Sequence, residues 1–350
     1  MKKKKNVFLT DCEAEVVSPL VNVLLFDSHP FDVMVHISNW KRSGKLSELK
    51  RYAIYFAVGF LYFVKRKNYA VVVGWQQFYT LIFCFFCSVF SVKKTFVTVA
   101  LNYTYKEKKG KFSKPYRWFM EKCLSPKYLD YIHVPSESYA NQICREFDFP
   151  RDRVVVTTFG ILDRYEELSK LSSPEGYKTD GYALAIGRSN RDYDFLIDAW
   201  QGIQYPLVII SDTYAKETSD PNITILRNVA GDESYPWIAN CGLMIIPIDD
   251  GSICSGDTVL LTAMSLERKI IVTKPSTLAE MYVEDGSNAV LVEKDAAMLK
   301  RAVNQILHTE QGNQLGKKAR ESFLTSFTIE SMGRKITHVL DSHAGVSKRN

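Results

Sequence analysis

Residues 242–272 read GLMIIPIDDGSICSGDTVLLTAMSLERKIIV, and their pattern predicts the architecture of the chain. An apolar run of strand length, residues 242–248, is followed by a polar loop. Residues 259–267 then bring apolar and helix-forming side chains, and a second apolar run, residues 269–272, closes the stretch. This succession predicts a strand–helix–strand unit, which implies a parallel sheet with ligand space at the carboxyl end of the first strand.

The loop inside this unit, DDGSICSGDT, is rich in small residues. Ser255, Gly256 and Thr258 would let the backbone approach a ligand closely, and the N–H groups of the following helix's first turn would form an anion site. We interpret the loop as a phosphate-binding site. The alternative is an ordinary turn in which a serine or an aspartate caps the helix.

Length and composition indicate a globular protein of two domains, because the 350 residues are 46% hydrophobic and 24% charged. The seven cysteines are odd in number and show no framework spacing, which favours a reducing, cytosolic compartment. Cys84 and Cys87 form a C-x-x-C pair inside an apolar run, so we expect buried thiols there. The six histidines have no spacing typical of zinc ligands.

Charge is distributed unevenly along the chain. Residues 1–150 contain 23 Lys+Arg against 12 Asp+Glu, although the whole chain has a net charge of +6. This excess suggests an anionic partner such as a membrane surface, a lipid phosphate or nucleic acid; the alternative is a solvated basic face. We expect no signal peptide and no spanning helix, because the longest apolar run, residues 81–92, has about 12 residues. That run could be a buried helix or could dip into a membrane interface.

Strand and helix patterns alternate from residue 33 to residue 340, and the polar segment 166–180 interrupts them. This predicts an α/β fold of two tandem Rossmann-like domains facing a cleft. We expect the first domain over residues 1–165 and the second over residues 166–325. A C-terminal helix, residues 326–350, would pack back on the first domain.

The segment AIGRSNRDYDFLIDAW places two arginines directly after a predicted strand that ends at Gly187. Arg188 and Arg191 would lie on the loop that begins the next helix. A guanidinium matches the geometry of phosphate oxygens, so two of them at a strand's carboxyl end can bind a diphosphate. The alternative is a pair of surface arginines on a strand–helix loop.

Over residues 134–307 the chain resembles the donor-binding half of retaining glycosyltransferases of the GT-B fold, family 4. The motifs that carry the resemblance are VPSESYANQI, VVVTTFGILD, GRSNRDYDFLIDA and SGDTVLLTAMSLERKIIVT, in the family's order. By this resemblance Arg188 matches the diphosphate arginine and Arg191 the lysine with the same role. Gly160 matches the glycine at the entry to the second domain. The resemblance implies that residues 166–325 bind the nucleotide-sugar donor and that residues 1–165 bind the acceptor.

The chain departs from the family at two glutamates spaced eight residues apart. Cys254 and Thr262 occupy these positions. The resemblance implies that Thr262 offers one hydroxyl to the ribose, and that Asp257 or Asp250 could supply the carboxylate that contacts the transferred sugar.

The resemblance implies transfer of a sugar from a nucleoside diphosphate sugar to an acceptor hydroxyl, with retention and without a metal or other cofactor. Arg188 and Arg191 would stabilise the leaving diphosphate. The expected acceptor is a glycan or lipid-linked glycan of a bacterial surface polysaccharide, reached from the cytoplasm on the membrane surface, with no nucleic acid involved. Asn102 is expected on the acceptor side. The donor would contact Gly160, Gly187, Arg188, Arg191, Ser211, Asp212, Asn228, Val229, Ser255, Gly256, Asp257, Thr258 and Thr262.

Two other classes remain open from the sequence. A metal-dependent GT-A-type transferase would use an aspartate pair, and Asp192 with Asp194 or Asp249 with Asp250 provides candidates. A non-catalytic, glycosyltransferase-like protein that binds only a nucleotide or a partner would explain the missing glutamates.

Overall fold

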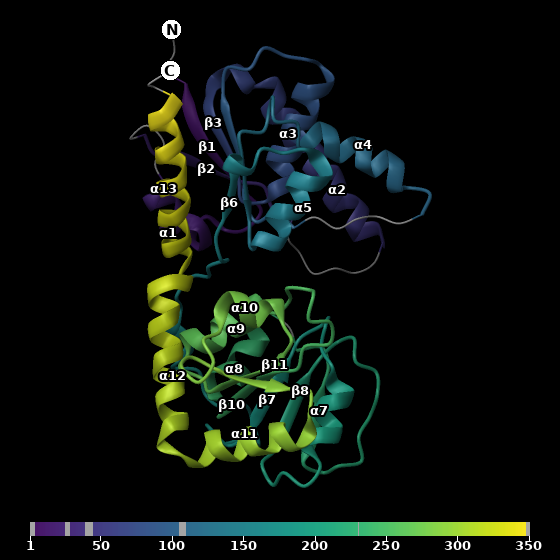
Figure 1. Cartoon of the computed structure of the whole chain (residues 1–350), viewed down its shortest axis with the longest axis vertical. Helices are drawn as coiled ribbons and strands as arrows, with labels where there is room; N and C mark the ends of the chain where they lie inside the picture. The colour runs from purple at the N-terminus through teal and green to yellow at the C-terminus, as the bar shows by residue number, and fades with distance from the viewer. Residues whose placement is uncertain (1–3, 25–28, 39–44, 105–109, 230, 348–350) are drawn as a thin grey trace. The chain divides into compact units, whose positions relative to one another are not determined.

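The computed structural model describes residues 4–24, 29–38, 45–104, 110–229 and 231–347 (Figure 1). The chain forms two compact units: unit 1 is Met1–Leu162 with Ile329–Asn350, and unit 2 is Asp163–Thr328. The divisions therefore fall at 162/163 and 328/329, against the expected 165/166 and 325/326. Asp163 belongs to unit 2 because both of its carboxylate oxygens accept hydrogen bonds from Arg320, at 2.7 and 2.8 Å.

Unit 1 is built on a parallel six-stranded sheet whose order, among the described residues, is β2-β1-β3-β4-β5-β6. The strands are β1 (Lys5–Thr10), β2 (Phe31–Val35), β3 (Tyr69–Gly74), β4 (Val97–Ala100), β5 (Tyr131–Val134) and β6 (Val154–Val156). The alternating pattern that starts at residue 33 did not include β1, which pairs with both β2 and β3. Its apolar residues are too few to stand out beside the lysine run that precedes them, yet Val7, Phe8 and Leu9 are fully buried.

The helices of unit 1 are α1 (Ala14–Val23), α2 (Lys45–Val64), α3 (Gln77–Val89), α4 (Ser113–Cys123), α5 (Glu137–Phe147) and α13 (Ile329–Ser347). Figure 1 shows α13 beside α1, and Thr337 Oγ1 donates to the carbonyl of Val23 at 3.1 Å. The C-terminal helix thus packs on the first unit. Cys84 and Cys87 are buried in α3, as predicted.

Unit 2 contains a second parallel sheet, with the order β12-β11-β10-β7-β8-β9 among the described residues. Its strands are β7 (Ala183–Ile186), β8 (Leu207–Ile210), β9 (Ile223–Leu226), β10 (Leu243–Ile246), β11 (Ile270–Lys274) and β12 (Val290–Glu293). Strands β7, β8 and β9 follow one another toward one edge of the sheet. Strands β10, β11 and β12 start beside β7 and follow one another toward the other edge. The strand order therefore reverses between β7 and β10, which is where doubly wound sheets bind ligands.

The helices of unit 2 are α6 (Tyr165–Leu168), α7 (Tyr193–Trp200), α8 (Tyr235–Asn240), α9 (Asp257–Ser265), α10 (Thr277–Tyr282), α11 (Ala296–His308) and α12 (Glu310–Ser322). Residues 242–272 form β10, α9 and β11, so the predicted strand–helix–strand unit is confirmed. The C-terminal helix expected over residues 326–350 is α13, and a π-helical turn (Phe323–Phe327) lies between it and α12.

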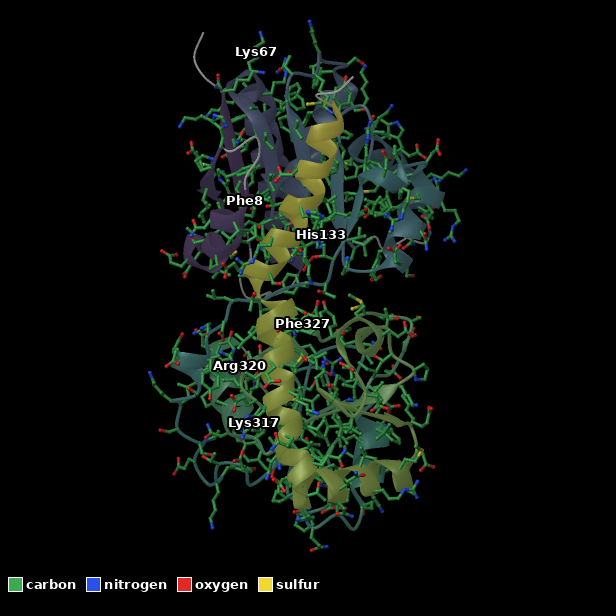
Figure 2. All side chains as sticks on the ribbon, turned by 60° about the vertical axis from the view of Figure 1, so that its left-hand side comes forward. Phe8, Lys67, His133, Lys317, Arg320 and Phe327 are labelled. Atoms are coloured by element: carbon green, nitrogen blue, oxygen red, sulfur yellow. The ribbon has the colours of Figure 1, made fainter. Side chains whose placement is uncertain are left out.

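Two aromatic side chains of the π-helical turn pack within unit 2. Phe327, labelled in Figure 2, packs edge-on against Tyr282 with ring centroids 5.2 Å apart, and Phe323 is fully buried. The predicted α/β class with two Rossmann-like domains is confirmed. Within the described ranges, none of the helices combines the length and apolar character that crossing a bilayer requires.

Candidate functional site

The loops that follow β7 and β10 are joined at the strand-order reversal of unit 2. The backbone N–H of Asp192 donates to the carbonyl of Pro247 at 2.8 Å, and Arg191 and Ile248 form an antiparallel bridge. The two segments that the sequence singled out separately, residues 187–192 and 247–258, therefore make one loop assembly at the carboxyl ends of neighbouring strands.

Asn190, which is not among the predicted site residues, holds this assembly together. Its Nδ2 donates to the carbonyls of Asp250 at 3.0 Å and Ile253 at 3.2 Å, and its Oδ1 accepts from the N–H of Asp250 at 2.7 Å. Its backbone is left-handed, with φ of 55°, a conformation that asparagine tolerates better than most residues. An asparagine inside the predicted phosphate loop, between Gly187 and the helix start, was the available signal.

Arg191 is enclosed by two glycines from the two loops. A Cβ on Gly187 would lie 2.8 Å from Arg191 Nε, and a Cβ on Gly256 would collide with Nη2 of the same side chain. Nη1 donates to the carbonyls of Asn190 at 3.1 Å and Ser189 at 3.3 Å, with Ser255 at 3.5 Å. The two glycines thus provide the space that the guanidinium occupies.

The charge of Arg191 is incompletely compensated. Its Nε is buried without a hydrogen-bond partner among the described residues. Burial lowers the pKa of the guanidinium, which nevertheless stays protonated because the pKa of arginine starts above 12. A buried cation with an unsatisfied donor attracts an anion, so the site is suited to phosphate oxygens.

The first turn of α9 carries an acid at the predicted phosphate site. Gly256 precedes the helix with φ of 101°, and Asp257 is the first helical residue. The Oδ1 of Asp257 accepts from the N–H of Thr258 at 2.9 Å, which takes one of the free N–H groups of the turn. Burial raises the pKa of the Asp257 carboxyl, and the nearby Arg191 charge opposes this shift.

A second group of predicted residues lies at the ends of β7, β8 and β9. The side chain of Arg188 is 63% exposed, and its Nε lies 4.0 Å from Oδ2 of Asp212. The Oδ1 of Asp212 accepts from the N–H of Asn228 at 2.8 Å. Ser211 is buried next to this carboxylate, and Val229, half-buried, follows Asn228.

The two residues in the family's glutamate positions are engaged within unit 2. Thr262 is 5% exposed, and its hydroxyl donates to the carbonyl of Thr258 at 2.8 Å. Cys254 Sγ lies 3.6 Å from Sδ of Met281, and burial raises the pKa of the Cys254 thiol to about 12. Neither side chain provides a carboxylate, and the thiol stays protonated near neutral pH.

The aspartates that could have formed a metal site have other partners. Asp192 caps α7 by accepting from the N–H of Phe195 at 3.0 Å and pairs with Lys294 at 2.9 Å. Asp194 pairs with Lys216 at 2.6 Å. The described part of the chain contains no group of three or more His, Cys, Asp or Glu side chains placed to hold a metal ion.

Gly160 and Asn102 belong to unit 1. Gly160 is buried and follows β6. Asn102 follows β4 with φ of 57°, and its N–H donates to Nδ1 of His133 at 3.0 Å. Since Nδ1 accepts, the proton of the neutral ring is on Nε2, which donates to the carbonyl of Thr157 at 3.0 Å. His133, labelled in Figure 2, thereby links the ends of β4, β5 and β6, and burial lowers its pKa to about 4.

Asn102 also borders a pocket of about 400 Å³ in unit 1. Asp11, after β1, and Trp75 and Gln76, after β3, line the same pocket. The strand order of unit 1 reverses between β1 and β3, so this pocket occupies the same topological position in unit 1 as the arginine loops do in unit 2.

Residues 181–309 match the family model described as "Glycosyl transferases group 1". No curated protein sequence matches the chain significantly. Among solved structures, HepE of Anabaena in complex with UDP is similar at 15% identity and a TM-score of 0.65, covering 97% of this chain and 100% of that one. Sucrose-phosphate synthase of Thermosynechococcus elongatus is similar at 12% identity and a TM-score of 0.66, with 98% and 100% covered.

The lipopolysaccharide outer core galactosyltransferase WaaB, in its apo form, is similar at 13% identity and a TM-score of 0.58, with 97% of this chain and 99% of that one covered. These three likenesses span both units. At such low identity they show a shared fold and leave the residues of the site to be argued from their own geometry.

Proposed function

We propose that this chain, which has the two-domain fold of GT-B glycosyltransferases and matches the group 1 glycosyl transferase model over residues 181–309, is a glycosyltransferase that moves a sugar from a nucleoside diphosphate sugar to an acceptor hydroxyl. The observation that carries the proposal is the buried guanidinium of Arg191, held between Gly187 and Gly256 with Nε unsatisfied. A leaving diphosphate would satisfy this donor.

In the proposed reaction the bond between the sugar's anomeric carbon and the β-phosphate oxygen breaks, and a bond from that carbon to the acceptor oxygen forms. Negative charge grows on the departing phosphate, and the acceptor hydroxyl loses its proton to that phosphate. Arg191 from within the loop assembly and Arg188 from its exposed rim stabilise this charge. Two arginines provide the neutralisation that a divalent cation supplies elsewhere, so the proposal requires no metal.

The nucleoside would lie toward β8 and β9. Ser211, Asp212, Asn228 and Val229 are gathered there, and Asp212 already orients the backbone of Asn228. A carboxylate and backbone groups beside an exposed arginine suit a base and its ribose. HepE was solved with UDP, which makes UDP the first nucleotide to test. We propose retention of configuration, by resemblance to family 4.

We further propose that the enzyme works in bacterial surface polysaccharide or glycolipid synthesis, at the cytoplasmic face of a membrane. The support is in unit 1. Residues 49–106 contain eight Lys+Arg and no Asp or Glu, and they expose large apolar side chains on α2. Basic charge next to exposed aromatic residues is typical of surfaces that contact anionic lipids.

A thermal-shift panel tests the donor site. UDP, GDP, ADP and their sugars are compared with and without Mg²⁺ and EDTA, because a ligand that binds only the native state raises the unfolding midpoint. We expect one nucleotide to raise the midpoint in EDTA, and the shift to disappear in Arg191→Ala. A shift that requires Mg²⁺ would contradict the arginine-based site, and no shift with any nucleotide would contradict donor binding.

A further inference from the structure

The polar pocket at the strand-order reversal of unit 1 adjoins a second, apolar pocket. Tyr52, Tyr55 and Phe78 line both, so the two share a wall. The apolar pocket has a volume of about 570 Å³ and lies among α2, α3 and α4. Each is within the usual size range of small-molecule sites.

The polar pocket presents unsatisfied hydrogen-bonding groups of both kinds. Arg51 Nε and Asn102 Oδ1 are buried, and neither has a hydrogen-bond partner among the described residues. Buried polar atoms are nearly always paired, so such a donor and acceptor bordering one pocket indicate a ligand that supplies the partners.

Asp11 adds a carboxylate to the same pocket. It is 8% exposed, and its Oδ2 accepts from Gln76 at 3.0 Å and from Ser38 at 3.2 Å. These neutral partners leave its negative charge in place. Arg51 already pairs with Glu48 at 3.1 Å, so the described lining of the pocket has no cation left over to offset Asp11 and would disfavour a phosphate. Sugar hydroxyls, by contrast, can donate to Asp11 and Asn102 and accept from Arg51.

The apolar pocket has the opposite character. Phe56, Phe112 and Phe119 contribute aromatic walls and Ile82 an aliphatic one, and its described lining contains no charged residue. The pocket would take an uncharged, flexible apolar group more readily than any polar one, because burying polar atoms against these rings leaves them without hydrogen bonds.

The surface around the apolar pocket extends this character. Leu49, Tyr52, Phe56 and Phe60 recur at helical spacing on α2 and are 66%, 43%, 41% and 46% exposed. An apolar stripe left open on a helix whose other face is buried marks a contact site. The absence of acidic residues from 49–106 makes this site compatible with an anionic lipid surface.

We propose that unit 1 binds an amphiphilic acceptor whose sugar head occupies the pocket of Asp11, Arg51 and Asn102 and whose hydrocarbon chain occupies the aromatic pocket of Phe56, Phe112 and Phe119. The inference rests on the proposed function, because it names the class of acceptor, a sugar on a lipid, that receives the transferred sugar. Its own observations are the shared wall and the two unsatisfied polar atoms.

Alkyl glucosides test the proposal on the full chain without a donor. Methyl, hexyl and octyl β-glucoside are titrated below their critical micelle concentrations by saturation-transfer NMR, which reports both affinity and the ligand protons in contact. We expect octyl glucoside to bind at least about a hundredfold more tightly than methyl glucoside, because each methylene that leaves water strengthens binding severalfold. Saturation should reach the protons of the alkyl group as well as those of the glucose ring.

Variants on one helix separate the pocket from the surface. Phe56→Ala should weaken octyl glucoside binding at least about tenfold, whereas Phe60→Ala, equally exposed on α2 but outside the pocket, should change it less than about twofold. Phe112→Ala tests the pocket a second time and should also weaken binding. Because Phe112 is 76% exposed, the fold does not depend on its ring. Asn102→Gly keeps the left-handed backbone and removes Oδ1, and it should weaken binding of the sugar head.

Two results would overturn the proposal: affinity independent of chain length, or an equal loss in Phe56→Ala and Phe60→Ala, which would indicate general contact of α2 with detergent. The nucleotide panel reports on unit 2 separately. If the protein binds a nucleotide but its affinity for alkyl glucosides does not depend on the length of the alkyl group, this inference fails and the proposed function stands. A chain that binds octyl glucoside but no nucleotide loses the proposed function alone.

Discussion

The guanidinium of Arg191 occupies the space in which residue 256 would carry its Cβ. Gly256 lies on the loop after β10 and Arg191 on the loop after β7, 65 positions apart in the sequence, and a Cβ at 256 would collide with Nη2. The glycine also has φ of 101°, which side chains rarely adopt. Glycine is therefore required at this position for two reasons, one local and one tertiary, and they can be separated experimentally.

Substitution of Gly256 should strongly reduce turnover of the donor. Gly256→Ala adds backbone strain and displaces Arg191, so we expect kcat/KM to fall by about a hundredfold or more. The matched control is Gly286→Ala, which has φ of 72° and open space around its Cβ. It should cost about 1 kcal/mol of stability and leave turnover unchanged. Equal turnover in the two variants would show that the Arg191 contact has no role.

The exposed arginine of the site should matter for chemistry rather than for folding. Arg188→Ala removes a cation whose side chain is 63% exposed, so the unfolding midpoint should stay within about 2 °C while kcat/KM falls about a hundredfold to a thousandfold. Arg188→Lys should recover part of the loss because charge returns without the planar fork. Arg145→Ala, at a side chain 76% exposed in unit 1, is the control and should retain full activity. Undiminished turnover in Arg188→Ala would remove Arg188 from the site.

Asn190 should act as a positioning residue for the loop assembly. Asn190→Gly preserves the left-handed backbone and removes three hydrogen bonds to the loop after β10. We expect kcat/KM to fall about tenfold, mostly through a higher KM for the donor, because the loop that carries Arg191 is no longer fixed against the loop that carries Gly256. Asn222→Gly, which also removes side-chain bonds to carbonyls but far from the loops, should cost stability without changing KM. Identical KM values in wild type and Asn190→Gly would contradict the assignment.

Acid should destabilise unit 1 through His133. Its pKa is lowered from 6.5 to about 4 by burial, so the folded state binds the proton less readily than the unfolded state does. The stabilising contribution is complete above pH 6.5 and is lost as the pH falls toward 4, by up to about 3 kcal/mol in all. His133→Gln should be less stable at pH 7 but should lose less free energy of unfolding between pH 7 and pH 4.5, measured by urea titration. Parallel pH curves for the two proteins would exclude His133 as the titrating group.

Much of the candidate donor site can be predicted from local patterns. Gly187, Arg188 and Arg191 were predictable because glycine and arginine at a strand's carboxyl end have a direct chemical meaning. The position of Asn190 between Gly187 and the helix start is a local signal, but its partners, the backbone groups of Asp250 and Ile253, lie some 60 positions away and are set by the tertiary structure. Asp257 was predicted to help bind the donor, and only the structure shows it accepting the Thr258 N–H at the start of α9.

The lipid-binding inference depends on structure in the same way. The sequence indicated a basic, aromatic N-terminal half and left open whether its apolar helices were core or interface. Exposure decides this: Tyr55 and Val58 of α2 are buried, while Phe56 and Phe60 of the same helix are not. A period of 3.6 residues assigns side chains to faces but does not say how many faces the neighbours cover.

The sequence by itself determined the α/β class, the order of most strands and helices, and the chemistry available after β7 and β10, since these depend on residues adjacent in the chain. Tertiary structure alone decided which loops share a site, because sheet order is set by the pairing of strands distant in sequence. It placed β7 next to β10 and β1 next to β3, and so brought Arg191 against Gly256 and Asp11 into one pocket with Gln76. Packing, which chooses among the pairings that local patterns allow, made a loop glycine and a distant arginine into one binding element.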